Sequence, residues 1–233
     1  MGAGWDGRLT GGFGKAACFS TQTFKHINSG EGGLMVTDDE DIAARAILFS
    51  GSYMLYEQHR ARPNADVFER HRFQTPNFSM RMSSLVAALL RRQMPLLDER
   101  NRRWREIYDH LAPLVGQIDH LSVPNRPAKE GFVPSSLQFS IVYLEQDQID
   151  AFLHGADAHG VHVKWFGRGA PVGFTSRHDH WRYMEGHNRK SVPHADRILQ
   201  GLCDLRLPPW LTAEDCNTVA QVLKEAMDAA LSR

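Results

Sequence analysis

Two short apolar runs separated by a polar, glycine-containing loop constrain the fold of this chain most strongly. Residues 16–20 and 33–37 have the apolar character of short strands. The loop between them, residues 21–32 (the lysine loop), contains Lys25 and runs into the Gly-Glu-Gly-Gly turn at 30–33. We therefore expect two neighbouring strands of one sheet, with an exposed loop that carries the lysine between them.

The residues around Lys25 suggest a chemical role. Phe24 and Ile27 flank it, and we expect partly desolvated surroundings, which disfavour the charged form of a lysine. Such a lysine can act as a nucleophile toward carbonyl groups. Most lysines are instead solvated and exposed, but Ser20 five residues before and the glycine turn five residues after favour a reactive role.

Further helices are predicted in the first half of the chain. The acidic residues 38–41 begin an apolar-periodic run that Gly51 ends, as expected of a helix with negative charge at its N-terminus. Residues 52–76 are polar and show no clear period, so we expect a long irregular segment. An amphipathic helix or helix pair begins at Ser83, and Pro95 should kink or divide it.

After Pro113 the pattern changes to short strands and helices. This alternation predicts a small α/β domain on an open sheet. The strands are expected at 121–123, 137–144 and 161–166, and the helices at about 146–159, 192–203 and 213–231.

Two segments resemble the DegT/DnrJ/EryC1/StrS family of sugar aminotransferases, which depend on pyridoxal 5'-phosphate (PLP). Ser20, Lys25 and the glycine turn are similar to the family's lysine motif, and residues 76–85 resemble its Asn-Tyr-Arg-Met-Thr segment. The resemblance implies an α/β, fold-type I transferase, of which this chain is the C-terminal part. Residues 1–112 would then be an incomplete large domain with a long connecting helix, and residues 113–233 a small α/β domain.

The resemblance also implies roles for single residues. Lys25 would form the Schiff base with PLP and move protons, and Ser20 would bind the cofactor phosphate. Asn77 would reach the phosphate of a neighbouring subunit's cofactor, so a homodimer with shared active sites is expected. The alternatives are a strand-end serine satisfied by the backbone and an asparagine that turns the chain. Asp6 resembles a turn residue and not the aspartate that contacts the pyridine nitrogen, which would lie upstream.

The implied reaction moves an amino group from glutamate or glutamine to a keto-sugar nucleotide or a related carbonyl compound. Members with histidine in place of the lysine act as sugar dehydratases, so Lys25 favours transamination. The alternative is a truncated, catalytically inactive remnant that folds and dimerises but binds PLP poorly. The sequence does not identify the acceptor or the amino donor.

Composition indicates which partners the chain can bind and in which compartment it is expected. Lys plus Arg and Asp plus Glu are equal at 27 each, so no field attracts nucleic acid or an anionic membrane, and a small-molecule enzyme fits better. Three scattered cysteines do not form a disulfide framework, which favours a reducing cytoplasm. No window approaches the roughly 20 apolar residues that a membrane span needs.

Histidines near position 180 raise a metal hypothesis. His178 and His180 share a His-x-His spacing, and His187 and His194 follow. Arginine and lysine side chains in the same stretch oppose a cation, so we expect a solvated or substrate-contacting loop and predict no metal site.

Overall fold

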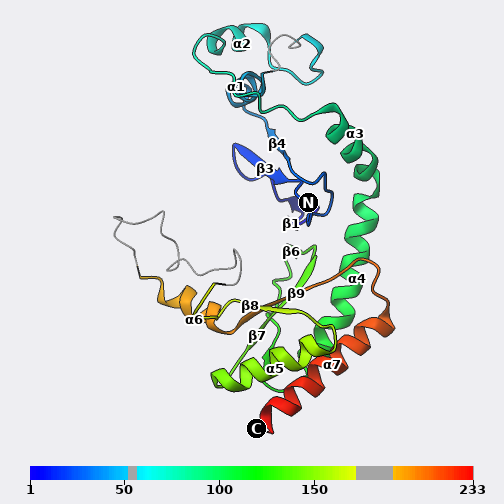
Figure 1. Cartoon of the computed structure of the whole chain (residues 1–233). Helices are drawn as coiled ribbons and strands as arrows, with labels where there is room; N and C mark the ends of the chain where they lie inside the picture. The colour runs from blue at the N-terminus through cyan, green and yellow to red at the C-terminus, as the bar shows by residue number, and fades with distance from the viewer. Residues whose placement is uncertain (52–56, 172–190, 233) are drawn as a thin grey trace. The chain divides into compact units, whose positions relative to one another are not determined.

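The computed structural model describes residues 1–51, 57–171 and 191–232 (Figure 1). The contacts divide the chain into two units. The first consists of Met1–Asn101 and Ala128–Val133, and the second of Arg102–Pro127 and Pro134–Arg233. Both units contain helices and strands, so the mixed α/β character expected from the sequence is confirmed.

Two small antiparallel sheets lie in the first unit. β3 (Ala16–Ser20) pairs with β4 (Gly33–Thr37) along its whole length, as predicted for the runs on either side of the lysine loop. A second sheet has the order β2-β1-β6, formed by Arg8–Leu9, Gly4–Trp5 and Glu130–Gly131. The sequence did not predict these strands, because two residues are too few to show a strand period.

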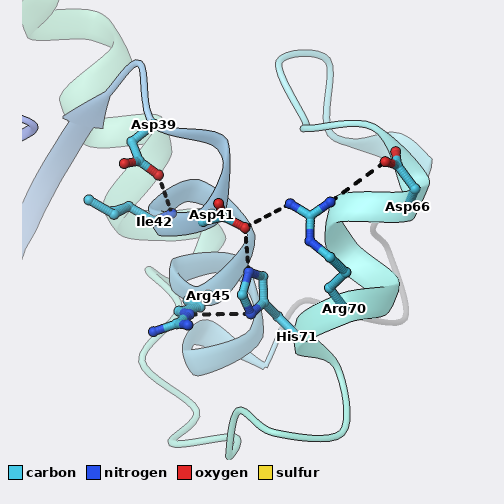
Figure 2. A network of polar contacts seen from close by, with 7 residues as sticks. All are labelled: Asp39, Asp41, Ile42, Arg45, Asp66, Arg70 and His71. Atoms are coloured by element: carbon cyan, nitrogen blue, oxygen red, sulfur yellow. Dashed lines mark hydrogen bonds and ion pairs between the residues drawn. The ribbon is translucent and has the colours of Figure 1, made fainter.

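The predicted acidic helix start and glycine stop are both present in α1 (Glu40–Ser50). The Asp39 side chain accepts a hydrogen bond from the Ile42 N–H at 3.0 Å, which satisfies one of the free donors of the first turn (Figure 2). Gly51 ends the helix with a φ of 77°, a left-handed conformation that glycine adopts readily.

A helix that the sequence did not predict follows. α2 (Ala65–His71) lies within residues 52–76, for which an irregular segment was expected, so that prediction is wrong. The helix has only seven residues and one short apolar pair, Val67 and Phe68, so its period is weak. Packing of these buried residues against α1 stabilises a helix that is too short to be stable alone.

Polar side chains also join α1 to α2 (Figure 2). The buried His71 ring accepts a hydrogen bond from Arg45 Nε at Nδ1 (3.3 Å), so its Nε2–H donates to Asp41 Oδ1 (2.5 Å). Arg70 Nη2 lies 3.0 Å from the same carboxylate oxygen. These hydrogen bonds, the one from His71 first, lower the pKa of the Asp41 carboxyl.

The long helical region is divided as Pro95 predicts. α3 (Ser84–Gln93) is followed by the 3₁₀ turn η2 (Met94–Leu96) and by α4 (Leu97–Val115). Because α4 begins in the first unit and continues in the second, it contributes to both. The domain boundary predicted after residue 112 stays a prediction.

The second unit contains a four-stranded antiparallel sheet of order β5-β7-β9-β8. Its strands are Leu121–Ser122, Ser136–Ile141, Leu202–Arg206 and Val163–Trp165. Its helices are α5 (Gln146–Ala158), α6 (Pro193–Gly201) and α7 (Ala213–Leu231). Figure 1 shows α5 and α7 side by side, where they pack together.

Several element boundaries in this unit differ from the predictions, by up to three residues, and one strand was missed. The helix expected to run to Cys203 ends at Gly201, and β9 begins at Leu202. Cys203 and Leu205 are buried on one face of this strand, an alternation of period two that the preceding helical pattern obscured.

The two units differ in how much apolar surface they bury. The second unit has a packed core in which Phe139, Phe152 and Leu223 are fully buried. Most of the large apolar side chains that remain exposed lie in the first unit, among them Phe24, Phe73, Phe78, Met80 and Leu85. The first unit therefore carries surface of the kind that interfaces use.

Candidate functional site

Backbone hydrogen bonds close the lysine loop. The Thr21 N–H donates to the Gly32 carbonyl at 2.9 Å, and the Ser29 N–H donates to the Thr21 carbonyl at 2.8 Å. Thr21 is fully buried, and its Oγ1 lies 2.9 Å from Ser29 Oγ. Gly32 has a φ of 132°, and a Cβ there would lie 3.0 Å from Thr21 Oγ1, so both conformation and space favour glycine.

Lys25 itself is exposed on this loop. Its N–H donates to the Gln22 carbonyl at 2.9 Å in a tight turn. Phe24 is 67% exposed, whereas Ile27 is only 1% exposed. The expectation of partly desolvated surroundings is therefore wrong for this chain, because the turn directs Phe24 and Lys25 outward and only Ile27 inward.

Ser20 ends β3, at the entrance to the lysine loop. Its Oγ accepts a hydrogen bond from the Gln22 N–H at 3.2 Å, the backbone interaction that the structural alternative predicts. A hydroxyl has one proton to donate in addition to its acceptor lone pairs. The backbone contact therefore orients Ser20 and leaves its proton able to bind an anionic oxygen.

Asn77 turns the chain before α3. Its Oδ1 accepts from the Ser79 N–H at 2.7 Å, and Ser79 has a φ of 53°, so the turn role is present. The Phe78 N–H donates to the Phe49 carbonyl at 3.0 Å, and the two rings stack at 5.4 Å. Among the described residues, no hydrogen bond links Asn77 to the lysine loop, and its Nδ2 faces no acceptor.

Three residues in or beside the lysine loop were not identified as site residues from the sequence. His26 is half-buried, with its Nδ1 3.2 Å from the Met1 carbonyl oxygen, and burial lowers its pKa. Gln93 and Arg100 both form hydrogen bonds to the loop. They lie more than sixty residues away along the chain, so no local pattern could have identified them.

Asp6 lies in the turn between β1 and β2, with a φ of 52°. It is exposed, and its Oδ2 is 3.0 Å from Lys129 Nζ. The structure thus agrees with its interpretation as a turn residue. No described carboxylate is assigned to the pyridine nitrogen.

The remaining sequence hypotheses concern metals, membranes and cysteines. His178, His180 and His187 lie outside the described residues, and the described part of the chain has no cluster of three potential metal ligands. No described helix has the length and apolarity to cross a membrane. The three cysteines are free thiols, and a cytoplasmic location stays a prediction.

Comparison with known families tests the resemblance found in the sequence. The model of the DegT/DnrJ/EryC1/StrS aminotransferase family matches residues 1–224. The chain belongs to this family. It is 25% identical over 230 residues to the spore coat polysaccharide biosynthesis protein SpsC of Bacillus subtilis (strain 168). That match covers 96% of the chain and 56% of SpsC, so the chain spans about half the length of this relative.

Solved structures show the same fold. The aminotransferase TlmJ from Streptoalloteichus hindustanus superposes with a TM-score of 0.73 at 22% identity, over 99% of this chain and 57% of TlmJ. The putative sugar aminotransferase Spr1654 from Streptococcus pneumoniae, in its PMP-form, superposes with a TM-score of 0.75 at 15% identity. That match covers 100% of this chain and 56% of Spr1654. The mixed α/β fold thus matches part of the fold-type I sugar aminotransferases.

Proposed function

We propose that this chain is part of a PLP-dependent aminotransferase. The enzyme would transfer an amino group from glutamate or glutamine to a keto-sugar nucleotide or a related carbonyl compound. The observation that carries this proposal is the exposed Lys25 on the loop between β3 and β4, at the spacing of the family's lysine motif. Family membership supports the reaction class, and lysine at this position favours transamination over dehydration.

The residues present fit the aldehyde and the phosphate of PLP. The Lys25 side chain is exposed and forms no ion pair with a described residue, so its Nζ can reach an aldehyde. The Ser20 hydroxyl keeps a proton for a phosphate oxygen, and hydrogen bonds to a charged acceptor are the stronger ones. The pyridine nitrogen has no assigned partner in this chain.

The chemistry then divides between cofactor and protein. PLP, when bound, supplies an electron sink that stabilises negative charge at the substrate carbon. Lys25 would hold the cofactor through Nζ, and its amine would move a proton at that carbon as a general base and acid. Ser20 Oγ would donate to the phosphate and fix its position.

A homodimer with shared sites is part of the proposal. Asn77 Nδ2 would donate to the phosphate bound by a second copy of the chain. Apolar side chains adjacent to it support an interface here, since Phe78, Met80, Leu85 and Leu89 are between 51% and 84% exposed. A polar anchor beside exposed apolar surface is typical of such interfaces.

Replacement of Lys25 tests the function directly. The protein would be incubated with PLP, reduced with borohydride and mapped by peptide mass. We expect the label on Lys25 in the unchanged chain and no visible PLP imine in Lys25→Ala, which should fold because an exposed loop lysine contributes little stability. Lys164→Ala, another exposed lysine, is the control and should keep the label. A protein labelled equally at all lysines would contradict the assignment.

The inactive remnant is the second candidate. The unassigned partner of the pyridine nitrogen favours it, because the electron sink weakens without that partner. Sedimentation and absorption spectra separate the two functions. A dimer without a visible PLP band supports the remnant, whereas a dimer with the band and the Lys25 label supports the enzyme.

A further inference from the structure

We propose that Gln93 and Arg100 are positioning residues for Lys25: they hold the backbone that follows the lysine and so fix where its amine is presented. The proposal rests on the proposed function. It goes beyond the residues that the motif identifies, because neither Gln93 nor Arg100 lies within it.

Gln93 binds the lysine loop through both ends of its carboxamide. Its Oε1 accepts from the Asn28 N–H at 3.1 Å, and its Nε2 donates to the Asn28 carbonyl at 2.7 Å. A side-chain amide thus satisfies both backbone groups of one residue, as a neighbouring strand would. Because Gln93 is the last residue of α3, the rigid end of a helix carries this contact.

Arg100 adds a second contact further along the helical region. Its Nη1 donates to the His26 carbonyl at 3.2 Å and to Gln93 Oε1 at 3.2 Å. The guanidinium therefore holds the loop and orients the glutamine at the same time. Between the two held residues, the Ile27 side chain is 1% exposed, which ties the segment to the interior.

The lysine loop needs these contacts because its own backbone bonds do not extend to this segment. The backbone hydrogen bonds across the described loop join Thr21 to Gly32 and Ser29, and Thr23 to Gly30. A further bond joins Lys25 back to Gln22, before this segment begins. Gln93 binds both backbone groups of Asn28 in this segment, and Arg100 binds the His26 carbonyl. Lys25 directly precedes this segment, so looser anchoring changes the direction from which its Nζ approaches an aldehyde.

Two measurements separate the anchor, meaning the contacts of Gln93 and Arg100 with Asn28 and His26, from its effect on Lys25. Amide hydrogen exchange at Asn28 reports the anchor without any cofactor, because the acceptor of that N–H is the side chain of Gln93. The rate of PLP labelling at Lys25, relative to Lys164 in the same sample, reports the presentation of the amine. In that reaction Nζ attacks the aldehyde carbon, water leaves, and hydride from borohydride reduces the C=N bond to a secondary amine.

The variants remove the contacts of Gln93 and Arg100 wholly or in part. Gln93→Leu removes both bonds to Asn28 at similar volume, and Gln93→Glu keeps the acceptor for the Asn28 N–H but loses the donor to its carbonyl. Arg100→Met removes the guanidinium. Gln221→Leu, an exposed helix residue bonded to its i+4 neighbour Glu225 (2.7 Å), is the matched control.

We expect Gln93→Leu and Arg100→Met to speed exchange at Asn28 about tenfold or more, as loss of one or two hydrogen bonds predicts. We also expect Lys25 labelling to slow about tenfold relative to Lys164, while exchange at Thr21 stays unchanged. Gln93→Glu should keep the protection of the Asn28 amide, and Gln221→Leu should change neither readout.

Three results would overturn the proposal. Unchanged exchange at Asn28 would mean that Gln93 does not hold the loop. Faster exchange with unchanged labelling would mean that the anchor does not position Lys25. If the unchanged chain gives no Lys25 label, the proposed function fails and the positioning role fails with it, while the exchange readout still shows whether the anchor exists.

Discussion

Replacing Gly51 with alanine tests how firmly the structure holds Asn77. Gly51 ends α1 with a φ of 77°, and a Cβ at this position would lie 2.5 Å from Asn77 Oδ1 and 2.8 Å from Arg81 Nη1. Real Cβ atoms essentially never approach other heavy atoms this closely, so one side chain must move. Arg81 can move more easily, since the hydrogen bond that its Nη1 makes to a described residue is a long one, 3.5 Å to the Ser50 carbonyl.

Asn77 is less free to move, and this determines how much stability Gly51→Ala costs. Its Oδ1 accepts from the Ser79 N–H at 2.7 Å, so displacing it breaks the turn before α3. Loss of that hydrogen bond should cost about 1 kcal/mol. The left-handed backbone costs a further ~1 kcal/mol for any residue with a Cβ. The expected total is about 2 kcal/mol of local stability, of which half belongs to Asn77.

Gly160→Ala is a matched control, because Gly160 also follows a helix and has a φ of 79°, and a Cβ added there would meet no atom within 4 Å. It should cost only ~1 kcal/mol, the backbone part. Native-state amide exchange at the C-terminal turn of α1 measures the cost of Gly51→Ala, and exchange at the C-terminal turn of α5 measures the cost of Gly160→Ala. In Gly51→Ala the further change Asn77→Ala should cost about 1 kcal/mol less than in the unchanged chain. Equal costs for the two glycine variants would refute the reasoning.

Three shorter predictions follow from burial and charge. Hydrogen bonds, the one from His71 first, lower the pKa of the Asp41 carboxyl, so the folded carboxylate stabilises the α1–α2 pair above its unfolded pKa of about 3.9. This contribution is lost as pH falls through the lower folded value. Protection of the α2 amides, that is, exchange relative to its intrinsic rate at each pH, should therefore fall between pH 5 and about pH 3, but not in Asp41→Asn. Phe152→Ala should destabilise the second unit by about 3–5 kcal/mol in urea unfolding, because Phe152 is fully buried. Burial raises the pKa of the Cys203 thiol to about 12, so alkylation followed by mass spectrometry should modify the exposed Cys18 first and Cys203 only after unfolding.

The fold was predictable where local signals were strong. The charges and caps of α1, the division at Pro95 and the bounds Ala213–Leu231 of α7 follow from local chemistry, and the structure confirms them. α2 was missed because packing against α1 stabilises it and its own periodicity is weak. β9 was missed because the helical pattern before it obscured its alternation. β1, β2 and β6 were missed because two residues show no clear period.

The candidate site likewise contains residues that the sequence identified and residues that it did not. Ser20, Lys25 and Asn77 stand out because motif spacing is a local property, and their roles in binding PLP stay predictions. The exposure of Lys25 could not be foreseen from its apolar neighbours, because the turn at Gln22 decides which side chains face outward. Contacts between distant residues, such as Gln93 with Asn28, depend on the tertiary fold alone.

The residues that match the motif are therefore not sufficient to build the site. Lys25 lies beside a segment that Gln93 and Arg100 hold, and Asn77 lies in a turn that has room only because Gly51 lacks a side chain. A chain could keep all three motif residues and lose the geometry through a change at any of these supporting positions, because each contact is a single side chain or the absence of one. Conversely, if Gln93→Leu and Gly51→Ala leave PLP labelling at Lys25 unchanged, the motif residues alone determine the reactivity.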